Sequence, residues 1–278
     1  MKVLIVGHGF VGKAVDACIK ESAEKLIIDP KYGNRIEDIE GFSADFAFIS
    51  VPTPMGANGQ QDDSIALDVI NTIKKLEPNC KIIVKSTILP DFFDSLKDQE
   101  NIIYNPEFLR EKSAIDDFIN AKFHIFGGDR NACESASKFY RDFSKCKNHE
   151  HYFTNIKTAS LIKYSINCFL ASKVLFFNKM FDLAEKLEVD DNWEDIINII
   201  SLDERIGKSH MNVPGHDGRR GFGGACFPKD TFALFKLFEK FNLDNESLKS
   251  MINENNKYRI QYSDLNDREK DQNVSFKI

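Results

Sequence analysis

Hydrophobic positions over the first 150 residues fall into short runs separated by longer amphipathic stretches. Six short apolar runs, typical of buried strands, occupy residues 3–6, 25–28, 46–51, 81–84, 102–104 and 124–126. Helical spacing of apolar residues occupies 12–21, 64–76, 91–97 and 130–143. Because strands and helices alternate, the pattern predicts an α/β fold built on a doubly wound parallel sheet with right-handed crossovers.

The pattern changes near residue 155. Residues 156–187 form one long helical stretch dense in Phe, Leu and Ile, and shorter helical patterns follow at 192–201, 228–241 and 245–258. Residues 202–225 carry six glycines and no periodicity, and a structureless loop of that length is usually functional. We therefore expect a sheet domain over residues 1–154, an all-helical domain over 155–261 and a frayed polar tail over 262–278.

Composition narrows the functional classes. The chain has 278 residues, of which 42% are hydrophobic and 29% charged, so we expect a globular protein of two modest domains. A net charge of -6 without a basic cluster argues against a nucleic-acid partner. No apolar run approaches the roughly 20 residues of a membrane span, and the N-terminal run is too short for a signal peptide, so we expect no membrane partner and a cytoplasmic location. Cysteines and histidines lack the spacing of metal ligands, so no metal site is expected.

A glycine-rich turn follows the first predicted strand and opens a helix: Gly7-His8-Gly9-Phe10-Val11-Gly12. In a Rossmann-type fold the first glycine makes the tight turn, the second lets backbone approach a pyrophosphate, and the third lets helix and strand pack closely. Asp29 ends the second predicted strand, where a carboxylate accepts hydrogen bonds from ribose hydroxyls and repels a 2′-phosphate, which favours NAD over NADP. The alternative reading of Asp29 is a turn residue before Pro30.

Polar residues also follow the third and fourth predicted strands. Pro52-Thr53 and Thr87 lie beyond the carboxyl ends of those strands, where doubly wound sheets bind ligands. Both threonines are placed to hydrogen-bond cofactor or substrate, and simple turn chemistry is the alternative.

Three further positions carry chemistry. Glu107 follows the fifth predicted strand beside apolar residues, so it is either a general base or an acid at a helix N-terminus. Lys163 and Asn167 lie four apart on the long helix and share a face; they either stabilise a developing oxyanion or mark the edge of a core helix.

Cys226 follows the glycine-rich loop and precedes Phe227-Pro228. Because proline is favoured at the start of a helix, the thiol is expected at a positive helix end near Lys229, and both effects favour the thiolate. The alternative is a small buried hydrophobic residue, as most isolated cysteines are.

Taken together, these motifs resemble the UDP-glucose/GDP-mannose dehydrogenase family from Gly7 to about Arg259. The most specific segments are Asn-Pro-Glu-Phe-Leu-Arg-Glu at 105–111, Lys-Tyr-Ser-Ile-Asn at 163–167 and Gly-Phe-Gly-Gly-Ala-Cys-Phe-Pro-Lys-Asp at 221–230. The resemblance implies oxidation of a nucleotide-sugar C6 alcohol to a carboxylate, UDP-glucose to UDP-glucuronate, in two hydride transfers to NAD through a Cys226 thiohemiacetal and thioester. It also implies that Lys163 and Asn167 stabilise the oxyanion, Asp230 helps to hold a water, and Glu107 directs that water with Thr87 nearby.

The resemblance also implies two binding sets and several partners. Cofactor binding is expected at Gly7, Gly9, Phe10, Val11, Gly12, Asp29, Pro52, Thr53, Thr87, Glu111 and Lys229. Substrate binding is expected at Glu107, Phe108, Leu109, Arg110, Lys163, Asn167, Arg205, Phe222 and Gly223, with Arg205 reaching a neighbouring subunit. Residues 156–187 would form a homodimer interface. Family members normally continue into a domain that grips the uridine diphosphate, so a separate UDP-binding chain is an expected partner.

Two alternatives stay open. A single-step 3-hydroxyacid-type dehydrogenase also pairs a Rossmann domain with a helical domain and also uses a lysine and an asparagine four apart. A non-catalytic NAD-binding remnant without the UDP-binding domain is the other.

Overall fold

The computed structural model describes residues 1–277 and divides into two compact units. The first unit comprises Met1–Thr53 and Asp62–Lys163, and the second comprises Pro54–Gln61 and the chain from Tyr164 onward. The expected boundary at residues 154/155 differs from this division, because the first two turns of the long helix pack with the sheet unit. Each unit is described separately below.

A seven-stranded sheet forms the centre of the first unit, in the order β2-β1-β3-β4-β5-β6-β7. Its strands are β1 (Lys2–Val6), β2 (Glu24–Ile28), β3 (Phe46–Ile49), β4 (Lys81–Val84), β5 (Ile102–Tyr104), β6 (His124–Gly128) and β7 (His151–Thr154). All neighbours are parallel except β5 and β6, so the sheet is mixed and the expectation of a wholly parallel sheet was wrong at this one pair. Strand β7 was not predicted, since its side chains are half-buried or exposed and give no apolar run.

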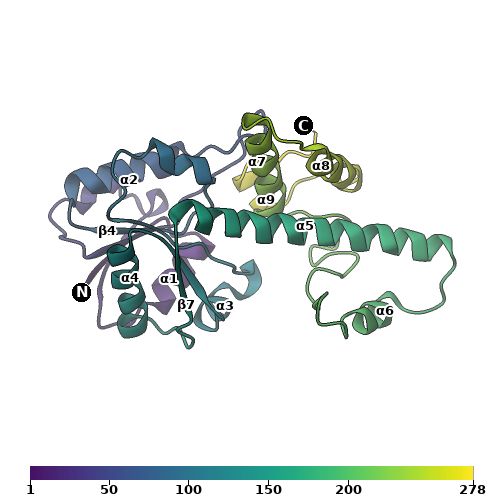
Figure 1. Cartoon of the computed structure of the whole chain (residues 1–278), viewed down its shortest axis with the longest axis horizontal. Coiled ribbons are helices and arrows are strands. Elements are labelled where there is room, and N and C mark those ends of the chain that lie inside the picture. Colours follow the sequence, from purple (N-terminus) through teal and green to yellow (C-terminus); the bar gives the residue numbers. More distant parts are fainter. Residues whose placement is uncertain (278) are drawn as a thin grey trace. The chain divides into compact units, whose positions relative to one another are not determined.

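Helices cover both faces of this sheet (Figure 1). On one face α2 (Ser64–Leu76) packs through Ala66, Val69, Ile70 and Ile73. On the other lie α1 (Phe10–Cys18), α3 (Ala114–Ile119) and α4 (Arg130–Phe143). Short 3-10 turns complete the unit: η1 (Pro30–Tyr32), η2 (Ile36–Ile39), η3 (Pro90–Ser95) and η4 (Glu111–Ser113). The helix predicted over 91–97 is therefore only the 3-10 turn η3. Covered on both faces, the inner strands β1 and β3 to β6 bury nearly every side chain, as their short apolar runs predicted. The edge strand β2 was also expected to be buried, but most of its side chains are only half-buried.

The second unit is helical, and no strand lies in its described residues. It contains most of α5 (Ile156–Lys186), with α6 (Trp193–Ile200), α7 (Phe227–Lys240), α8 (Glu246–Arg259) and α9 (Asp267–Asp271). Its largest apolar cluster joins Ala171 and Leu175 of α5 to Phe222 and to Met251 of α8. Residues 201–226 are a loop without helix or strand, as the glycine-rich sequence predicted.

Residues beyond 261 are not a frayed tail, so that expectation was wrong. Asn266 and Glu269 form a capping box that starts α9, and the side chains of Glu269, Val274 and Phe276 are buried. The segment looked disordered in sequence because its charged residues have no periodicity. Glu269 can be buried because its carboxylate pairs with the Arg259 guanidinium, which replaces the lost hydration.

Helix α5 is long and apolar enough to cross a membrane by length and composition alone. A core helix of a globular protein passes the same test, and half of the most apolar window of α5 is buried within the structure. Two of its lysines, Lys163 and Lys173, are buried with partners, which is typical of a core helix.

Candidate active site and cofactor loop

The turn from β1 to α1 has the geometry of a dinucleotide-binding loop. Gly7 has φ +81°, and a Cβ there would lie 2.5 Å from the carbonyl oxygen of Ser50 after β3. A Cβ on Gly12 would collide with the carbonyl oxygen of Gly7, whereas a Cβ on Gly9 would have no heavy atom within 4 Å. Gly7 and Gly12 therefore close the turn, and Gly9 alone faces open space, which fits the approach of a pyrophosphate. Phe10 and Val11 begin α1, and the positive dipole end of a helix N-terminus favours an anion there.

Asp29 serves this loop and a turn at once. Its Oδ2 accepts a hydrogen bond from the His8 amide at 2.6 Å, and its Oδ1 accepts one from the Lys31 amide at 3.0 Å, which caps η1. Burial opposes ionisation, but these amides and the Lys31 ammonium outweigh it and hold the pKa of Asp29 below its usual range. The ribose role and the turn role proposed from sequence are therefore compatible, because an ionised carboxylate is fixed beside the glycine loop.

The loops after β3 and β4 are tied to each other. The Thr53 hydroxyl donates to the carbonyl oxygen of Thr87 at 2.9 Å, and Ser86 donates to the carbonyl oxygen of Val51 at 2.7 Å. Thr53 is buried, whereas Pro52 is exposed. Turn chemistry, the alternative reading of these residues, is thus present in the structure.

A buried ion pair joins Glu107 to Lys163 in the first unit. The Lys163 Nζ lies 3.2 Å from Glu107 Oε1, and it also donates to the Glu107 carbonyl oxygen and sits 5.1 Å from the centre of the Phe108 ring. Glu107 Oε2 accepts from the Leu109 amide at 2.7 Å. Arg110 turns away to the surface. A cation held at a buried site of this kind can stabilise negative charge that develops on a substrate oxygen.

Arg110 and Glu111 lie at the edge of this site. The Arg110 guanidinium pairs with Asp117 at 2.7 Å and is largely exposed, which raises the pKa of Arg110 through that hydrogen bond. Glu111 begins η4. Their expected contacts with substrate and cofactor remain predictions.

A second polar cluster lies in the second unit. Asp230 is fully buried: its Oδ2 accepts from Asn167 Nδ2 at 2.7 Å and its Oδ1 from Lys229 Nζ at 2.6 Å. The Cys168 thiol lies 3.8 Å from the Asp230 carbonyl oxygen. The hydrogen bond between the Asn167 side-chain amide and Asp230 therefore joins α5 to the start of α7. Sequence reasoning treated Asn167, Asp230 and Lys229 separately and did not foresee this cluster.

Cys226 is the cap residue at the N-terminus of α7, with Pro228 at the second helical position. All six cysteines lie within the described residues, and Cys226 is partly exposed whereas the other five are buried. The alternative of a buried hydrophobic cysteine therefore fits the other five better than Cys226. A thiol at a helix N-terminus with partial exposure is the setting in which cysteines become reactive.

The remaining predicted residues lie in the second unit. Arg205 is exposed and pairs with Asp203 at 2.6 Å. Phe222 is buried, and its amide and carbonyl groups are both bound by Asn255 of α8. Gly223 passes directly over Arg259.

Sequence reasoning missed Asn255, Arg259 and Glu269. A usable signal existed for two of them: Asn255 and Arg259 are polar, four apart on one helix and face its buried side. Arg220 pairs with Asp182 at 2.5 Å and donates to Asn178 Oδ1 at 2.8 Å.

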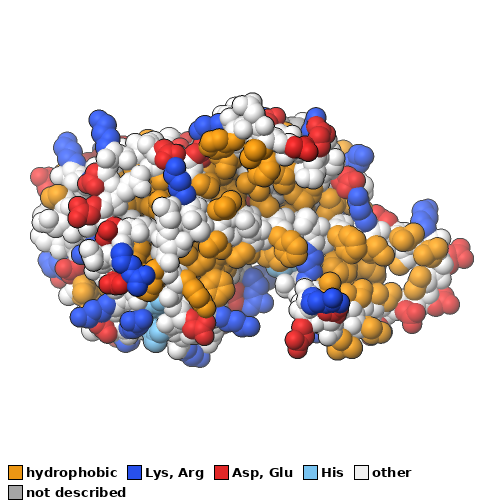
Figure 2. Space-filling view, in the orientation of Figure 1, with side chains coloured by type: hydrophobic (Ala, Val, Ile, Leu, Met, Phe, Trp, Pro, Cys, Tyr) orange, Lys and Arg blue, Asp and Glu red, His pale blue; other side chains and the backbone are white. Residues whose placement is uncertain are grey.

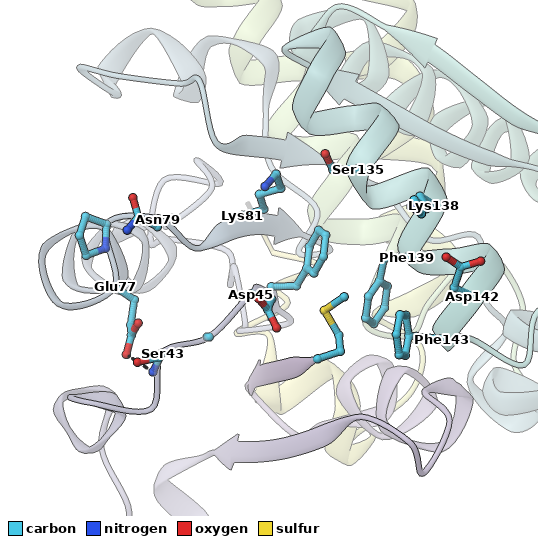
Figure 3. A pocket seen from close by; sticks show the side chains of 14 residues that line it. Ser43, Asp45, Glu77, Asn79, Lys81, Ser135, Lys138, Phe139, Asp142 and Phe143 are labelled. Atoms are coloured by element: carbon cyan, nitrogen blue, oxygen red, sulfur yellow. Dashed lines mark hydrogen bonds between the residues drawn. The ribbon is translucent and has the colours of Figure 1, made fainter.

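A separate cavity and the lack of a metal-ligand cluster in residues 1–277 further describe the protein. A cavity of about 640 Å³ lies at the amino ends of β1, β3 and β4, the sheet edge opposite the glycine loop (Figure 3). Its wall includes Glu77, which accepts from the Ser43 amide at 2.8 Å, and Asp45, which accepts from the Lys2 amide at 2.7 Å. No group of three or more His, Cys, Asp or Glu side chains suited to a metal ion occurs within residues 1–277.

Two segments of the chain match two domains of one protein family. The NAD binding domain of the UDP-glucose/GDP-mannose dehydrogenase family matches residues 34–144, and the central domain of the same family matches residues 157–257. UDP-glucose 6-dehydrogenase of Rickettsia felis is 34% identical over 252 residues, which cover 87% of this chain and 53% of that protein. UDP-glucose 6-dehydrogenase TuaD of Bacillus subtilis is 26% identical over 95% of this chain and 64% of its own length. The chain thus spans about half to two thirds of the length of these relatives.

Solved structures agree on the fold. A UDP-glucose dehydrogenase from Pyrobaculum islandicum superposes with a TM-score of 0.76 at 24% identity, covering 94% of this chain and 69% of that one. A 3-hydroxyisobutyrate dehydrogenase from Mycobacterium tuberculosis superposes with a TM-score of 0.64 at 15% identity, covering 99% and 96%. Both share the Rossmann unit followed by helices. With two domains matched in order, the chain belongs to the UDP-glucose/GDP-mannose dehydrogenase family.

Proposed function

We propose that this chain catalyses the NAD-dependent oxidation of a nucleotide-sugar C6 alcohol to a carboxylate, with UDP-glucose as substrate and UDP-glucuronate as product. One observation carries the proposal: partly exposed Cys226 caps α7, and the first turn of that helix holds the buried cluster of Asp230, Lys229 and Asn167. The names of the Rickettsia and Bacillus relatives supply the substrate class.

Cys226 is proposed as the nucleophile. Its thiolate adds to the carbonyl carbon of the aldehyde formed in the first oxidation, and protonation of the oxygen gives a thiohemiacetal. Oxidation of that adduct gives a thioester, whose C–S bond breaks when water adds, releasing the thiol and the carboxylate. The N-terminus of α7 supports this role, because a helix N-terminus favours the thiolate over the thiol. The glycine loop would hold NAD, and two molecules bound in turn would supply the oxidant, one hydride from the C6 carbon going to each.

The other polar residues act on oxygen atoms. Lys163 and Asn167 are proposed to donate to the C6 oxygen as negative charge develops on it. Glu107 is proposed to direct the hydrolytic water with Thr87 nearby, and Asp230 to help hold that water. The ion pair of Glu107 with Lys163 and the bond of Asn167 to Asp230 support these roles, since each donor is already oriented by a carboxylate.

NAD is proposed to bind at the glycine loop. The open space at Gly9, the helix N-terminus of α1 beside it and ionised Asp29 support this assignment. An ionised carboxylate at Asp29 also favours NAD over NADP, because it repels a 2′-phosphate.

A homodimer through residues 156–187 is proposed from the exposed apolar side chains of α5. Phe169, Phe176 and Leu183 are between half and two thirds exposed, and Figure 2 shows hydrophobic side chains gathered along this helix. Exposed apolar surface of this kind marks an interaction site. A separate UDP-binding chain and a cytoplasmic location complete the proposal.

The test is NADH release from purified protein with a panel of UDP- and GDP-sugars. We expect two NADH per sugar oxidised, and no reduction with any member of the panel would refute the proposal. Cys226→Ser should stop turnover after the first oxidation.

A single-step 3-hydroxyacid dehydrogenase is the second candidate, favoured by the near-complete coverage of the Mycobacterium tuberculosis structure. Such an enzyme would tolerate Cys226→Ser and release one NADH per substrate. A non-catalytic NAD-binding protein would bind NAD but no sugar nucleotide in calorimetric titration.

A further inference from the structure

The segment after α8 folds back onto the glycine-rich loop of the second unit. Helix α9 brings Glu269 against this loop, and Val274 and Phe276 are buried beyond it. The Gln272 carbonyl oxygen also accepts a hydrogen bond from the Met55 amide at 2.9 Å. The segment is therefore fixed at several points.

Glu269 uses both carboxylate oxygens. Its Oε1 accepts from Arg259 Nη2 at 2.6 Å and from the Gly224 amide at 3.0 Å. Its Oε2 accepts from the Asn266 amide at 2.9 Å. The side chain is fully buried, so the Gly224 amide is held by a charged acceptor shielded from water.

Arg259 fixes Glu269 from the other side. Its guanidinium is almost fully buried and also donates to Asp217 Oδ2 at 2.8 Å. A Cβ on Gly223 would collide with Arg259 and lie 2.6 Å from Glu269 Oε1. The loop backbone thus runs in direct contact with the ion pair, and a side chain at position 223 would have to displace the Arg259 or Glu269 side chain.

Loop residues 221–224 have three side-chain anchors. Asn178 accepts from the amide of Gly221 at 3.0 Å, Asn255 binds the amide and the carbonyl oxygen of Phe222 at 2.7 and 2.9 Å, and Glu269 accepts from the amide of Gly224. Gly221 and Gly224 have positive φ angles of 74° and 80°, and glycine backbone is costly to order without such bonds. Of the three anchors, Glu269 binds nearest along the chain to Cys226, which lies two residues beyond Gly224.

We propose that Glu269 is a positioning residue: through the Gly224 amide it fixes the chain that leads into Cys226 at the N-terminus of α7. The proposal rests on the proposed role of Cys226 as nucleophile.

The test compares three variants of the full chain. Glu269→Gln keeps an oxygen acceptor for Gly224, whereas Arg259→Met/Glu269→Met removes that acceptor together with both fully buried charges. Asp217 loses the Arg259 guanidinium in the double variant, but it is partly exposed to water and keeps the Arg219 amide as a donor. Asp267→Asn is the matched control, since it lies on the same helix and its side chain is 95% exposed. Thermal unfolding establishes that each variant is folded.

Two readouts need neither NAD nor sugar. Hydrogen exchange of the peptide over residues 221–227 should quicken about fivefold in the double variant, as expected for losing one hydrogen bond. The pH midpoint of Cys226 alkylation by iodoacetamide should rise there, because the thiol is less firmly held at the helix N-terminus. Glu269→Gln and Asp267→Asn should leave both close to wild type, and buried Cys168 should react equally slowly in all variants.

Contrary results are distinct from these. A folded double variant with unchanged exchange and an unchanged pH midpoint overturns the proposal, as does equal acceleration of Cys226 and Cys168, which marks general loosening. If the double variant does not fold, Glu269→Asp replaces it, since the shorter side chain retracts the carboxylate from Gly224 and should shift both readouts in the same direction. Failure of the sugar panel with success here would refute the proposed function alone.

Discussion

Removing the cation from the buried pair in the first unit should be costly. In Lys163→Met the Glu107 carboxylate stays buried and keeps the Leu109 amide as a donor, but it loses its cation. Breaking a buried pair by deleting one partner costs about 3–5 kcal/mol, whereas replacing both partners by neutral groups is often nearly neutral. For a unit of this size the urea slope is about 2–3 kcal/mol/M, so the midpoint should fall by about 1–2 M.

Urea denaturation followed by far-UV circular dichroism measures this shift. The single tryptophan, Trp193, lies in α6 of the second unit, so its fluorescence reports that unit separately. Lys157→Met is the matched control on the same helix: Lys157 pairs with Asp94 at 2.6 Å, but both side chains are about half exposed, and such pairs contribute less than about 1 kcal/mol. Glu107→Gln/Lys163→Met should recover most of the lost stability. A Lys163→Met midpoint no lower than that of Lys157→Met, or a double variant no more stable than Lys163→Met, would refute the reasoning.

Three further predictions follow from single contacts. Burial lowers the pKa of Lys85 to about 8, below the unfolded value of about 10.4. Between these two pH values the unfolded chain binds more protons than the folded one, so the free energy of unfolding rises with pH. Urea titrations should therefore show the stability of wild type relative to Lys85→Met rising by about 3 kcal/mol across that window. A falling difference would contradict this. Gly12→Ala should destabilise the protein by about 1–3 kcal/mol through overpacking, whereas Gly9→Ala should leave the urea midpoint unchanged and weaken NAD binding in calorimetry; the reverse order would refute the assigned roles. Asn255→Ala should quicken amide exchange at Phe222 and lower the free energy of unfolding by about 1–3 kcal/mol, because two backbone groups lose their partner; unchanged exchange would show that Asn255 is not their anchor.

Much of the fold could be read from apolar spacing, and the exceptions have physical causes. The strands buried on both faces gave short apolar runs, and α2 and α4 were predicted with the bounds that the structure shows. Strand β7 lies at the sheet edge with half-buried or exposed side chains, so it gave no such signal. The direction of β6 could not be predicted, since alternation of strand and helix does not by itself fix the direction of each strand.

The candidate catalytic residues could be predicted from residue type and position along the chain, but the residues that they contact could not. Glu107, Lys163, Asn167 and Cys226 were singled out because each stands beside a strand end, on a buried helix face or at a helix start. Which of them touch one another depends on chain folding over long separations: Glu107 meets Lys163 across 56 residues, and Asn167 meets Asp230 across 63.

The sequence by itself determined the glycine turn, the helix that begins at Cys226 and the division into a sheet part and a helical part, because these follow from backbone freedom and from local apolar periodicity. Only the tertiary structure decided how polar residues pair, and the C-terminal segment is the clearest case. Residues 262–277 looked like a solvated tail, since their charges have no pattern along the chain. In the folded unit Glu269 is fully buried against Arg259, because a charge leaves water when a partner distant in sequence replaces the lost hydration.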